Sequence, residues 1–274
     1  MNMDWLESIL FGLVCGLAEF LPVSAQAHET LLLKMFGASA TPLMYLVIHG
    51  AVLLALYQGC AEHISQILRE QRLLRIPPRR RKRQPDMVKV LDMRLLRTAT
   101  IVLALGFFAY PTLSAWRSDL HIIAPILVIN GIIVYIPMHM ATGNKDSRSM
   151  SQLDAVLIGL CGALAVIPGI SPVSTITAAG IARGADREQS LRWSYLLCIP
   201  ALLIRMGFDV YGIMSGGLGV VSIVQLVLAA VAAFGGAWSS IRMMRFLAVR
   251  AGYSCFAYYC WGAALFSMII YLTV

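Results

Sequence analysis

The chain has 274 residues, of which 59% are hydrophobic and 13% are charged. An average soluble domain is about 45–50% apolar and about 25% charged, so this chain has too little polar surface to coat a globule of its size. The composition therefore excludes an ordinary soluble enzyme, a disordered chain and a coiled coil. It predicts an all-α polytopic membrane protein.

The net charge of +8 is concentrated in one segment, residues 61–94, which links two apolar stretches and holds ten of the 22 Lys and Arg residues. A basic segment beside membrane spans is typical of a cytoplasmic loop in contact with anionic lipid. Nucleic acid is not expected as a partner, because the basic run at 79–83 has no interleaved aromatic residues.

Six stretches are long and apolar enough to cross a hydrocarbon core, which needs roughly 20 residues per helix. In chain order they are 41–60, 95–113, 121–140, 193–213, 218–241 and 252–273. Two further apolar segments, 5–36 and 153–183, are interrupted by Pro22 and Pro168. Irregular backbone at membrane depth survives only where protein or a water-filled cavity satisfies it. We therefore predict two re-entrant helix–loop–helix hairpins whose tips meet near the midplane.

The two interrupted segments resemble each other. Cys15-Gly16 precedes Pro22-Val23-Ser24 by five residues, and Cys161-Gly162 precedes Pro168-Gly169-Ile170-Ser171 by the same spacing. Three candidate spans follow each copy, and an odd number of spans places the second copy upside down. The sequence thus predicts an inverted-topology repeat with halves at 1–140 and 150–274, and a binding site where the hairpins meet.

Glu19 is the strongest candidate functional residue, because a carboxylate within an apolar run usually faces a cavity or a partner. His28 follows across the Pro22 break, and a hairpin can return it to the depth of Glu19. The two are interpreted as an acid/base pair or as metal ligands. The alternative is that they bond only each other or loop backbone. Glu29 is expected at the mouth of the hairpin.

The second hairpin offers a candidate substrate-binding loop that contains Gly169, Ser171, Ser174 and Thr175. Backbone N–H groups at a helix N-terminus together with hydroxyl groups suit a phosphate; the alternative is ordinary helix capping by these residues.

Three further polar residues lie within candidate spans. His49 is also placed among the candidate substrate-binding residues, although a lone histidine in a span is as often structural. Arg205 and Asp209 are four residues apart, which favours an ion pair on one helix face.

Residues 15–28 resemble the first motif of the bacterial undecaprenyl-diphosphate phosphatases, the bacitracin-resistance family, which reads roughly EGLTEFLPVSSTGH. Nine of its fourteen positions agree. The second motif, roughly PGxSRSG, is matched at Pro168, Gly169 and Ser171, and the segment Ile48-His49-Gly50 looks like a further family segment. The resemblance extends over nearly the whole chain.

The resemblance implies a multi-pass protein of the bacterial cytoplasmic membrane that removes one phosphate from undecaprenyl diphosphate, a lipid carrier of cell-wall synthesis. It implies Glu19, Ser24 and His28 as catalytic residues, and Mg²⁺ or another divalent cation held by Glu19. The chain departs from the motifs at functional positions: Cys15 replaces the first Glu, Ala25 the second Ser, and Pro172, Val173 and Ser174 the Arg, Ser and Gly that end the second motif.

These departures leave three functional hypotheses. The first is a divergent undecaprenyl-diphosphate phosphatase, in which Arg183, Arg187 or Arg205 replaces the lost motif arginine. The second is a catalytically degenerate homologue that binds or translocates a polyprenyl-phosphate lipid without hydrolysis. The third is a solute or ion carrier in which Glu19 is a proton site.

Overall fold

The computed structural model describes residues 3–141, 143–250 and 252–273, and the described residues form helices and connecting loops without a β-strand. The α-helices are α1 (Trp5–Phe20), α2 (Ala25–Phe36), α3 (Pro42–Arg75), α4 (Met87–Gly106), α5 (Tyr110–Leu113), α6 (Leu120–Met138), α7 (Gln152–Ala163), α8 (Pro172–Ala182), α9 (Arg187–Gly216), α10 (Ile223–Arg250) and α11 (Cys255–Thr273). Short 3₁₀ helices are η1 (Pro78–Arg80), η2 (Phe107–Ala109), η3 (Ser114–Ser118) and η4 (Leu164–Val166).

Six of the described helical segments are long and apolar enough to cross a membrane: α3, α4 with its continuation to Ser118, α6, α9, α10 and α11. Many large apolar side chains on these helices are exposed, among them Phe108, Val231 and Leu272. An apolar surface of this extent is unfavourable in water and suits lipid. The prediction of an all-α polytopic membrane protein with six spans is therefore confirmed.

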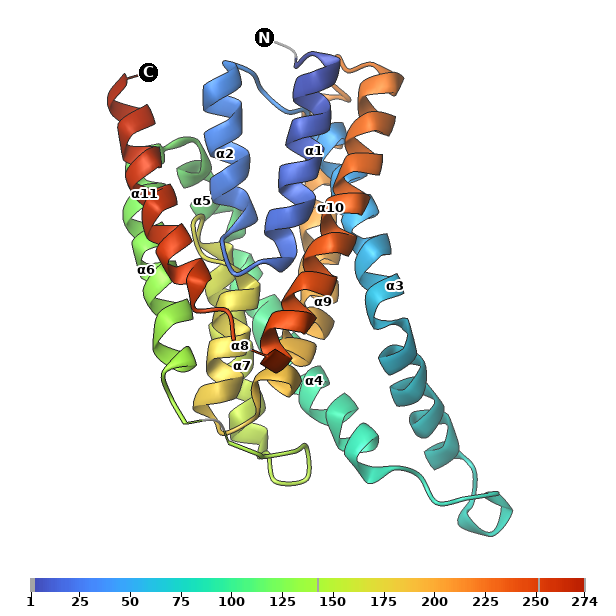
Figure 1. Cartoon of the computed structure of the whole chain (residues 1–274). Coiled ribbons are helices and arrows are strands. Elements are labelled where there is room, and N and C mark those ends of the chain that lie inside the picture. Colours follow the sequence, from blue (N-terminus) through green and yellow to red (C-terminus); the bar gives the residue numbers. More distant parts are fainter. Residues whose placement is uncertain (1–2, 142, 251, 274) are drawn as a thin grey trace.

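The helices α1, α2, α7 and α8 are shorter and form two antiparallel pairs, α1–α2 and α7–α8, that approach each other from opposite ends of the bundle (Figure 1). The α1–α2 pair begins at the end where both chain termini lie, and the α7–α8 pair begins at the other end. Asn130 of α6 joins their loops: its Nδ2 donates to the Pro22 carbonyl oxygen and its Oδ1 accepts from the Ser171 N–H, both at 2.9 Å. The polar loops thus satisfy each other inside the bundle.

Close packing against α10 holds the first helix pair in place. A Cβ atom at Gly12 or Gly16 would lie only 2.2 or 2.1 Å from a backbone carbonyl oxygen of Ala229 or Ala233, respectively. Small residues at this spacing allow two helix backbones to approach closely, as is common between membrane helices. Glycine is therefore required at both positions of α1.

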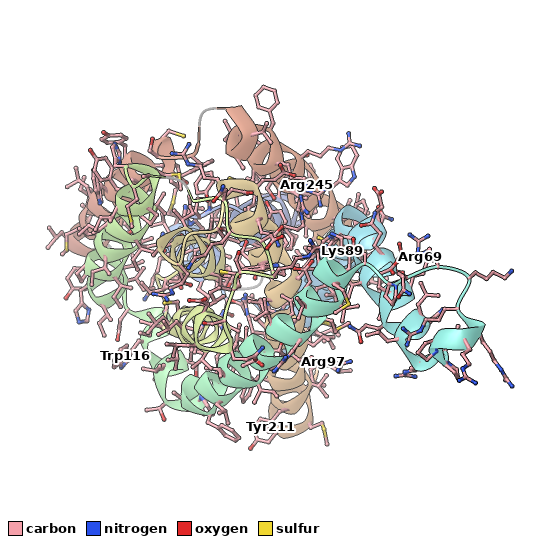
Figure 2. All side chains as sticks on the ribbon, turned by 90° about the horizontal axis from the view of Figure 1, so that it is seen from below. Arg69, Lys89, Arg97, Trp116, Tyr211 and Arg245 are labelled. Atoms are coloured by element: carbon pink, nitrogen blue, oxygen red, sulfur yellow. The ribbon has the colours of Figure 1, made fainter. Side chains whose placement is uncertain are left out.

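The basic segment 61–94, predicted as a loop, is mostly helical, and this is a correction. Helix α3 continues to Arg75 and α4 begins at Met87, so that the two project beyond the rest of the bundle (Figure 1) and only residues 76–86 join them. Residues 61–75 are rich in strong helix formers, which form a helix whether or not they are apolar, and Pro77 and Pro78 stop it. Viewed from below, Arg69 and Lys89 lie on this projection (Figure 2).

Candidate active site

Glu19 of α1 forms a buried ion pair with Arg205 of α9. Nη1 of the guanidinium lies 2.9 and 3.1 Å from the two carboxylate oxygens, and the two residues are only 5% and 6% exposed. Glu19 lies one residue before the end of α1, which carries its side chain to the centre of the bundle. A charge buried at such depth requires a partner of opposite charge, and Arg205 supplies it.

Glu29 extends this pair into a chain of four charges. Its Oε1 lies 3.5 Å from Nη2 of Arg205, and its Oε2 lies 2.8 Å from Nη2 of Arg117 in η3. The expectation that Glu29 lies at the mouth of the hairpin is wrong, because the residue is only 2% exposed. Two carboxylates and two guanidinium groups balance each other, which lets Glu19, Glu29 and Arg205 remain buried while Arg117 is partly exposed.

A small cavity lies beside Arg205. Its described lining includes Glu19, Gln26 and Arg205 from one side and Ile170 and Pro172 of the second loop from the other. Its volume of about 20 Å³ is close to the minimum for one water molecule. Nε of Arg205 and Oε1 of Gln26 are buried without a hydrogen-bond partner in the described part of the chain. A donor and an acceptor are therefore free where the two loops meet.

The three hydroxyl groups predicted to bind phosphate differ in their partners. Ser171 begins α8 as its N-cap and accepts from the Ser174 N–H, while its own hydroxyl donates to the Leu21 carbonyl oxygen at 3.2 Å. Thr175 donates to backbone carbonyl oxygens of its own turn. Gly169 turns the chain with φ +102°, and the Ser174 hydroxyl is buried without a partner among the described residues. Helix capping, the alternative interpretation of Ser171, is what the geometry supports.

Glu19 and His28 both lie about one turn from the first loop, but they face different helices, and no bond joins them among the described contacts. Nδ1 of His28 donates to the Ser24 carbonyl oxygen at 2.8 Å, so in the neutral ring Nε2 accepts from the Tyr259 hydroxyl of α11 at 2.7 Å. Ser24 has φ +68° and a buried hydroxyl for which the described residues provide no partner. The expected Glu19–His28 pair is replaced by separate partners.

His49 and Asp209 form a second buried pair, between α3 and α9. Nδ1 of His49 lies 2.6 Å from Oδ2 of Asp209. The predicted ion pair between Arg205 and Asp209 is wrong, because each residue pairs with a different helix. His49 also stacks on Tyr45, with ring centroids 6.1 Å apart, and its Nε2 is buried without a partner among the described residues. Its role as a substrate-binding residue stays a prediction.

Of the three arginines considered as replacements for the motif arginine, Arg205 alone lines the cavity that Pro172 also lines. Arg183 pairs with Asp154 at 2.5 Å, and Arg187 donates to the Met138 carbonyl oxygen at 3.0 Å. Of the three, Arg205 of α9 is therefore the one that lies beside the cavity that Pro172 lines.

Sequence reasoning missed three residues of the site. Asn130 is a single amide inside an otherwise apolar span, and such residues usually bond across helices; this signal was sufficient to find it. Arg117 lies between two predicted spans, where the sequence does not indicate a partner inside the bundle. Tyr259 has no local signal, because its role depends on the packing of α11 against the first loop.

The residues present do not fit a resident divalent cation. Mg²⁺ prefers several oxygen ligands and usually binds through one or two carboxylates plus substrate phosphates. Within the described ranges no group of three or more His, Cys, Asp or Glu side chains is placed to hold a metal. Glu19 and Glu29 are each bonded to a guanidinium group, which stands where a cation would.

Six candidate spans and a buried, charged cluster where two helix-pair loops meet define an integral membrane protein with a polar site inside its bundle. The chain belongs to the family described as bacitracin resistance protein BacA, whose model matches residues 8–266.

Similar proteins include undecaprenyl-diphosphatases from several organisms. The one from Alkaliphilus metalliredigens is 27% identical, with 97% of this chain and 100% of that protein covered. The one from Methanobrevibacter smithii is also 27% identical, over 94% and 95% of the two chains. The one from Desulforapulum autotrophicum is 28% identical, over 97% and 98%.

Proposed function

We propose that this chain is an undecaprenyl-diphosphate phosphatase of the bacterial cytoplasmic membrane. One observation carries the proposal: Arg205 brings a guanidinium group to the cavity shared by Glu19, which the first motif retains, and Pro172, which replaces the arginine of the second motif. Phosphoryl transfer depends mainly on charge neutralisation and positioning. A relocated arginine meets this requirement.

A second relocation supports the same proposal. Cys15 stands where the first motif has a glutamate, and it lies in α1 one turn before Glu19, which shares Arg205 with Glu29. Glu29 thus supplies a second carboxylate next to the position that lost one. The carboxylate and the guanidinium absent from the motifs are both restored from elsewhere in the chain.

In the proposed reaction, water attacks the terminal phosphorus atom, and the bond from this phosphorus to the bridging oxygen breaks. The products are undecaprenyl phosphate and inorganic phosphate. Arg205 binds the phosphate oxygens and neutralises the charge that develops on them, after exchanging its bonds to Glu19 for bonds to phosphate. His28, which the first motif retains, takes up or supplies the proton after one of its ring nitrogens exchanges its present bond to Ser24 or Tyr259 for the reacting group. The cavity of about 20 Å³ must widen for this exchange.

No step is assigned to a divalent cation, because both carboxylates are bonded to guanidinium groups. We propose that any Mg²⁺ dependence arises from metal that the diphosphate itself carries. Chelation by EDTA is then expected to weaken the apparent affinity for substrate and to leave the thermal stability of the protein unchanged.

We also propose the predicted membrane arrangement, with α1–α2 and α7–α8 as re-entrant hairpins in inverted halves. The helix packing supports it: α1 packs on α10 as α7 packs on α4, and α3 packs on its counterpart α9 as α6 packs on α11. An axis that exchanges the halves would produce these pairings. Cysteines introduced at the exposed residues Trp5 and Met35, near the two ends of the α1–α2 pair, should react with a membrane-impermeant thiol reagent from the same side of the membrane, whereas a single straight span would place them on opposite sides.

Anionic lipid is proposed as a partner at the basic end of the bundle. A pocket of about 320 Å³ lies there, and its described lining contains three cations, Lys89, Arg192 and Arg245, and two carboxylates, Glu62 and Glu188. Glu188 pairs with Arg192 at 2.7 Å. Figure 2 shows Lys89 and Arg245 on this end. The Tyr195 hydroxyl in the same lining is buried without a partner in the described part of the chain. Basic pockets between membrane helices on the cytoplasmic side bind anionic headgroups.

The function is tested with purified protein and undecaprenyl diphosphate by measuring phosphate release. We expect release by the natural protein, a loss of about 10³-fold or more in Arg205→Gln, as for arginine fingers, and loss in His28→Ala. Arg97→Gln, an exposed arginine of α4, is the matched control and should keep full activity. Lipid binding without release would instead favour the binding or translocating homologue. If neither lipid binding nor phosphate release is measured, the solute or ion carrier remains as the hypothesis.

A further inference from the structure

A second cavity, which we call the outer pocket, lies at the end of the bundle where the chain termini lie. It has a volume of about 650 Å³, within the range of small-molecule sites. It is formed by the last turns of α2, the start of α3 and η3, and its described lining is Thr30, Leu33, Lys34, Gly37, Ala38, Ser39, Ala40, Tyr45, Ser114, Ala115, Arg117 and Ser118. It lies opposite the basic projection of α3 and α4 (Figure 1).

The lining of the outer pocket has the chemistry of an anion site. Lys34 and Arg117 contribute positive charges, five residues contribute hydroxyl groups, and no carboxylate is among the described lining residues. Lys34 is exposed and forms no ion pair within the described ranges. The Thr30 hydroxyl donates to the Arg117 carbonyl oxygen at 2.6 Å, which fixes η3 against α2.

Glu29 connects the outer pocket to the inner cavity. One of its oxygens contacts Arg117, which lines the outer pocket, and the other contacts Arg205, which lines the cavity beside Pro172. Two guanidinium groups are thus held around a single anionic group. A diphosphate carries two anionic phosphates joined by one oxygen, so it matches this pair of guanidinium groups in number. Each guanidinium group must exchange a present partner to bind a phosphate oxygen, because Arg205 bonds Glu19 and Arg117 bonds Glu29 and donates to the Tyr110 hydroxyl at 2.9 Å. The two cavities differ in size, at about 650 Å³ for the outer pocket and about 20 Å³ for the inner cavity, so only the outer pocket has room for a phosphate group.

We propose that the outer pocket is a phosphate-binding site in which Lys34 and Arg117 hold a phosphate group beside the inner cavity. The group is either the terminal phosphate of the lipid diphosphate or the phosphate ion that hydrolysis releases. The identity of the lipid rests on the proposed function, whereas phosphate binding at the pocket does not. Charge-assisted hydrogen bonds to phosphate oxygens supply the affinity.

Binding is tested with the purified full chain in detergent by titrating inorganic phosphate and inorganic diphosphate at low ionic strength. The test variant is Lys34→Glu, because Lys34 is exposed and its replacement leaves the buried charges intact. We expect the Kd for at least one of these anions to rise about tenfold, as the loss of one charge-assisted bond implies. Lys34→Gln should raise it less, and Arg97→Gln should leave it unchanged. Thermal unfolding should show that all three variants are folded.

Enzyme kinetics then distinguish the two sources of the phosphate group. If the pocket holds released phosphate, inorganic phosphate inhibits hydrolysis, and Lys34→Glu weakens that inhibition. If it holds the lipid headgroup, Lys34→Glu raises KM for undecaprenyl diphosphate and changes kcat little. The proposal is overturned if Lys34→Glu alters neither anion affinity, nor phosphate inhibition, nor KM. If this result is obtained and the protein still hydrolyses undecaprenyl diphosphate, the proposed function stands without the outer pocket. If the pocket binds phosphate but no hydrolysis is measured, the outer pocket stands and the proposed function is rejected.

Discussion

Arg205 of α9 donates to both carboxylate oxygens of Glu19 in α1, across 186 residues of sequence. The bond joins a helix of the first half of the chain to a helix of the second half, at the cavity that Pro172 also lines. Because Glu29 contacts Nη2 of the same guanidinium group, Arg205 is fixed from two sides. A single arginine therefore both stabilises the helix packing and presents a cation to the cavity.

Returning an arginine to position 172 should compensate for the loss of Arg205. Arg205→Ala alone is expected to reduce phosphate release about 10³-fold or more, by analogy with arginine fingers. The double variant Arg205→Ala, Pro172→Arg should release phosphate at least about tenfold faster than Arg205→Ala alone, because both positions line the same cavity. Pro172→Arg alone serves as the control. Equal activity of the single and double variants would show that a guanidinium in this cavity is not what catalysis requires.

Removing the Tyr259 hydroxyl should slow catalysis while leaving substrate binding unchanged. This hydroxyl bonds Nε2 of His28 at 2.7 Å, and groups that orient a reacting histidine are typically worth about 10–100-fold. Tyr259→Phe is therefore expected to lower kcat about tenfold, to shift the pH profile of kcat, and to leave KM within about twofold. The neighbouring exposed Tyr258 provides the matched control, Tyr258→Phe. An unaltered pH profile would assign His28 a structural role.

The spans and the two interrupted helix pairs could be predicted because their signals are local. Hydrophobic length identifies a span, and Pro22 and Pro168 mark the places where a helix must stop. The helical extension of α3 to Arg75 was missed because low hydrophobicity was interpreted as a loop, although helix propensity does not depend on apolarity.

The partners within the site could not be predicted in the same way. The spacing of Arg205 and Asp209 permits a local ion pair, yet Arg205 bonds Glu19 and Glu29, and Asp209 bonds His49. Which acid an arginine meets depends on which helix faces pack together, and one sequence does not encode this locally. The candidate residues Glu19 and His28 were identified by type, but their partners, Arg205 and Tyr259, emerge only from the three-dimensional packing.

Neutralising Glu29 should destabilise the protein strongly. Glu29→Gln leaves the guanidinium groups of Arg117 and Arg205 without the carboxylate between them, and breaking a buried ion pair costs about 3–5 kcal/mol. The double variant Glu29→Gln, Arg117→Gln should recover part of the loss, because coupled residues are not additive. Thermal unfolding in detergent measures both, with the exposed Asp119→Asn as control. Additive losses in the double variant would contradict the pairing of Glu29 with Arg117.

Asn130 provides the last test, because it holds the two loops together with a single side chain. It is fully buried, donates to the Pro22 carbonyl oxygen, and accepts from the Ser171 N–H. Asn130→Leu leaves the Ser171 N–H without its acceptor, at about 1–3 kcal/mol, and leaves the Pro22 carbonyl oxygen with only the weak thiol donor of Cys260. Asn130→Asp keeps an acceptor for Ser171, and its neutral carboxyl group has one O–H that can donate to Pro22. We therefore expect the free energy of unfolding to fall most in Asn130→Leu and by an intermediate amount in Asn130→Asp if the new carboxyl group is neutral. Phosphate release should fall in the same order, because the loops carry the opposite walls of the cavity. A stable Asn130→Leu variant with full activity would show that the site does not depend on the contact between the loops.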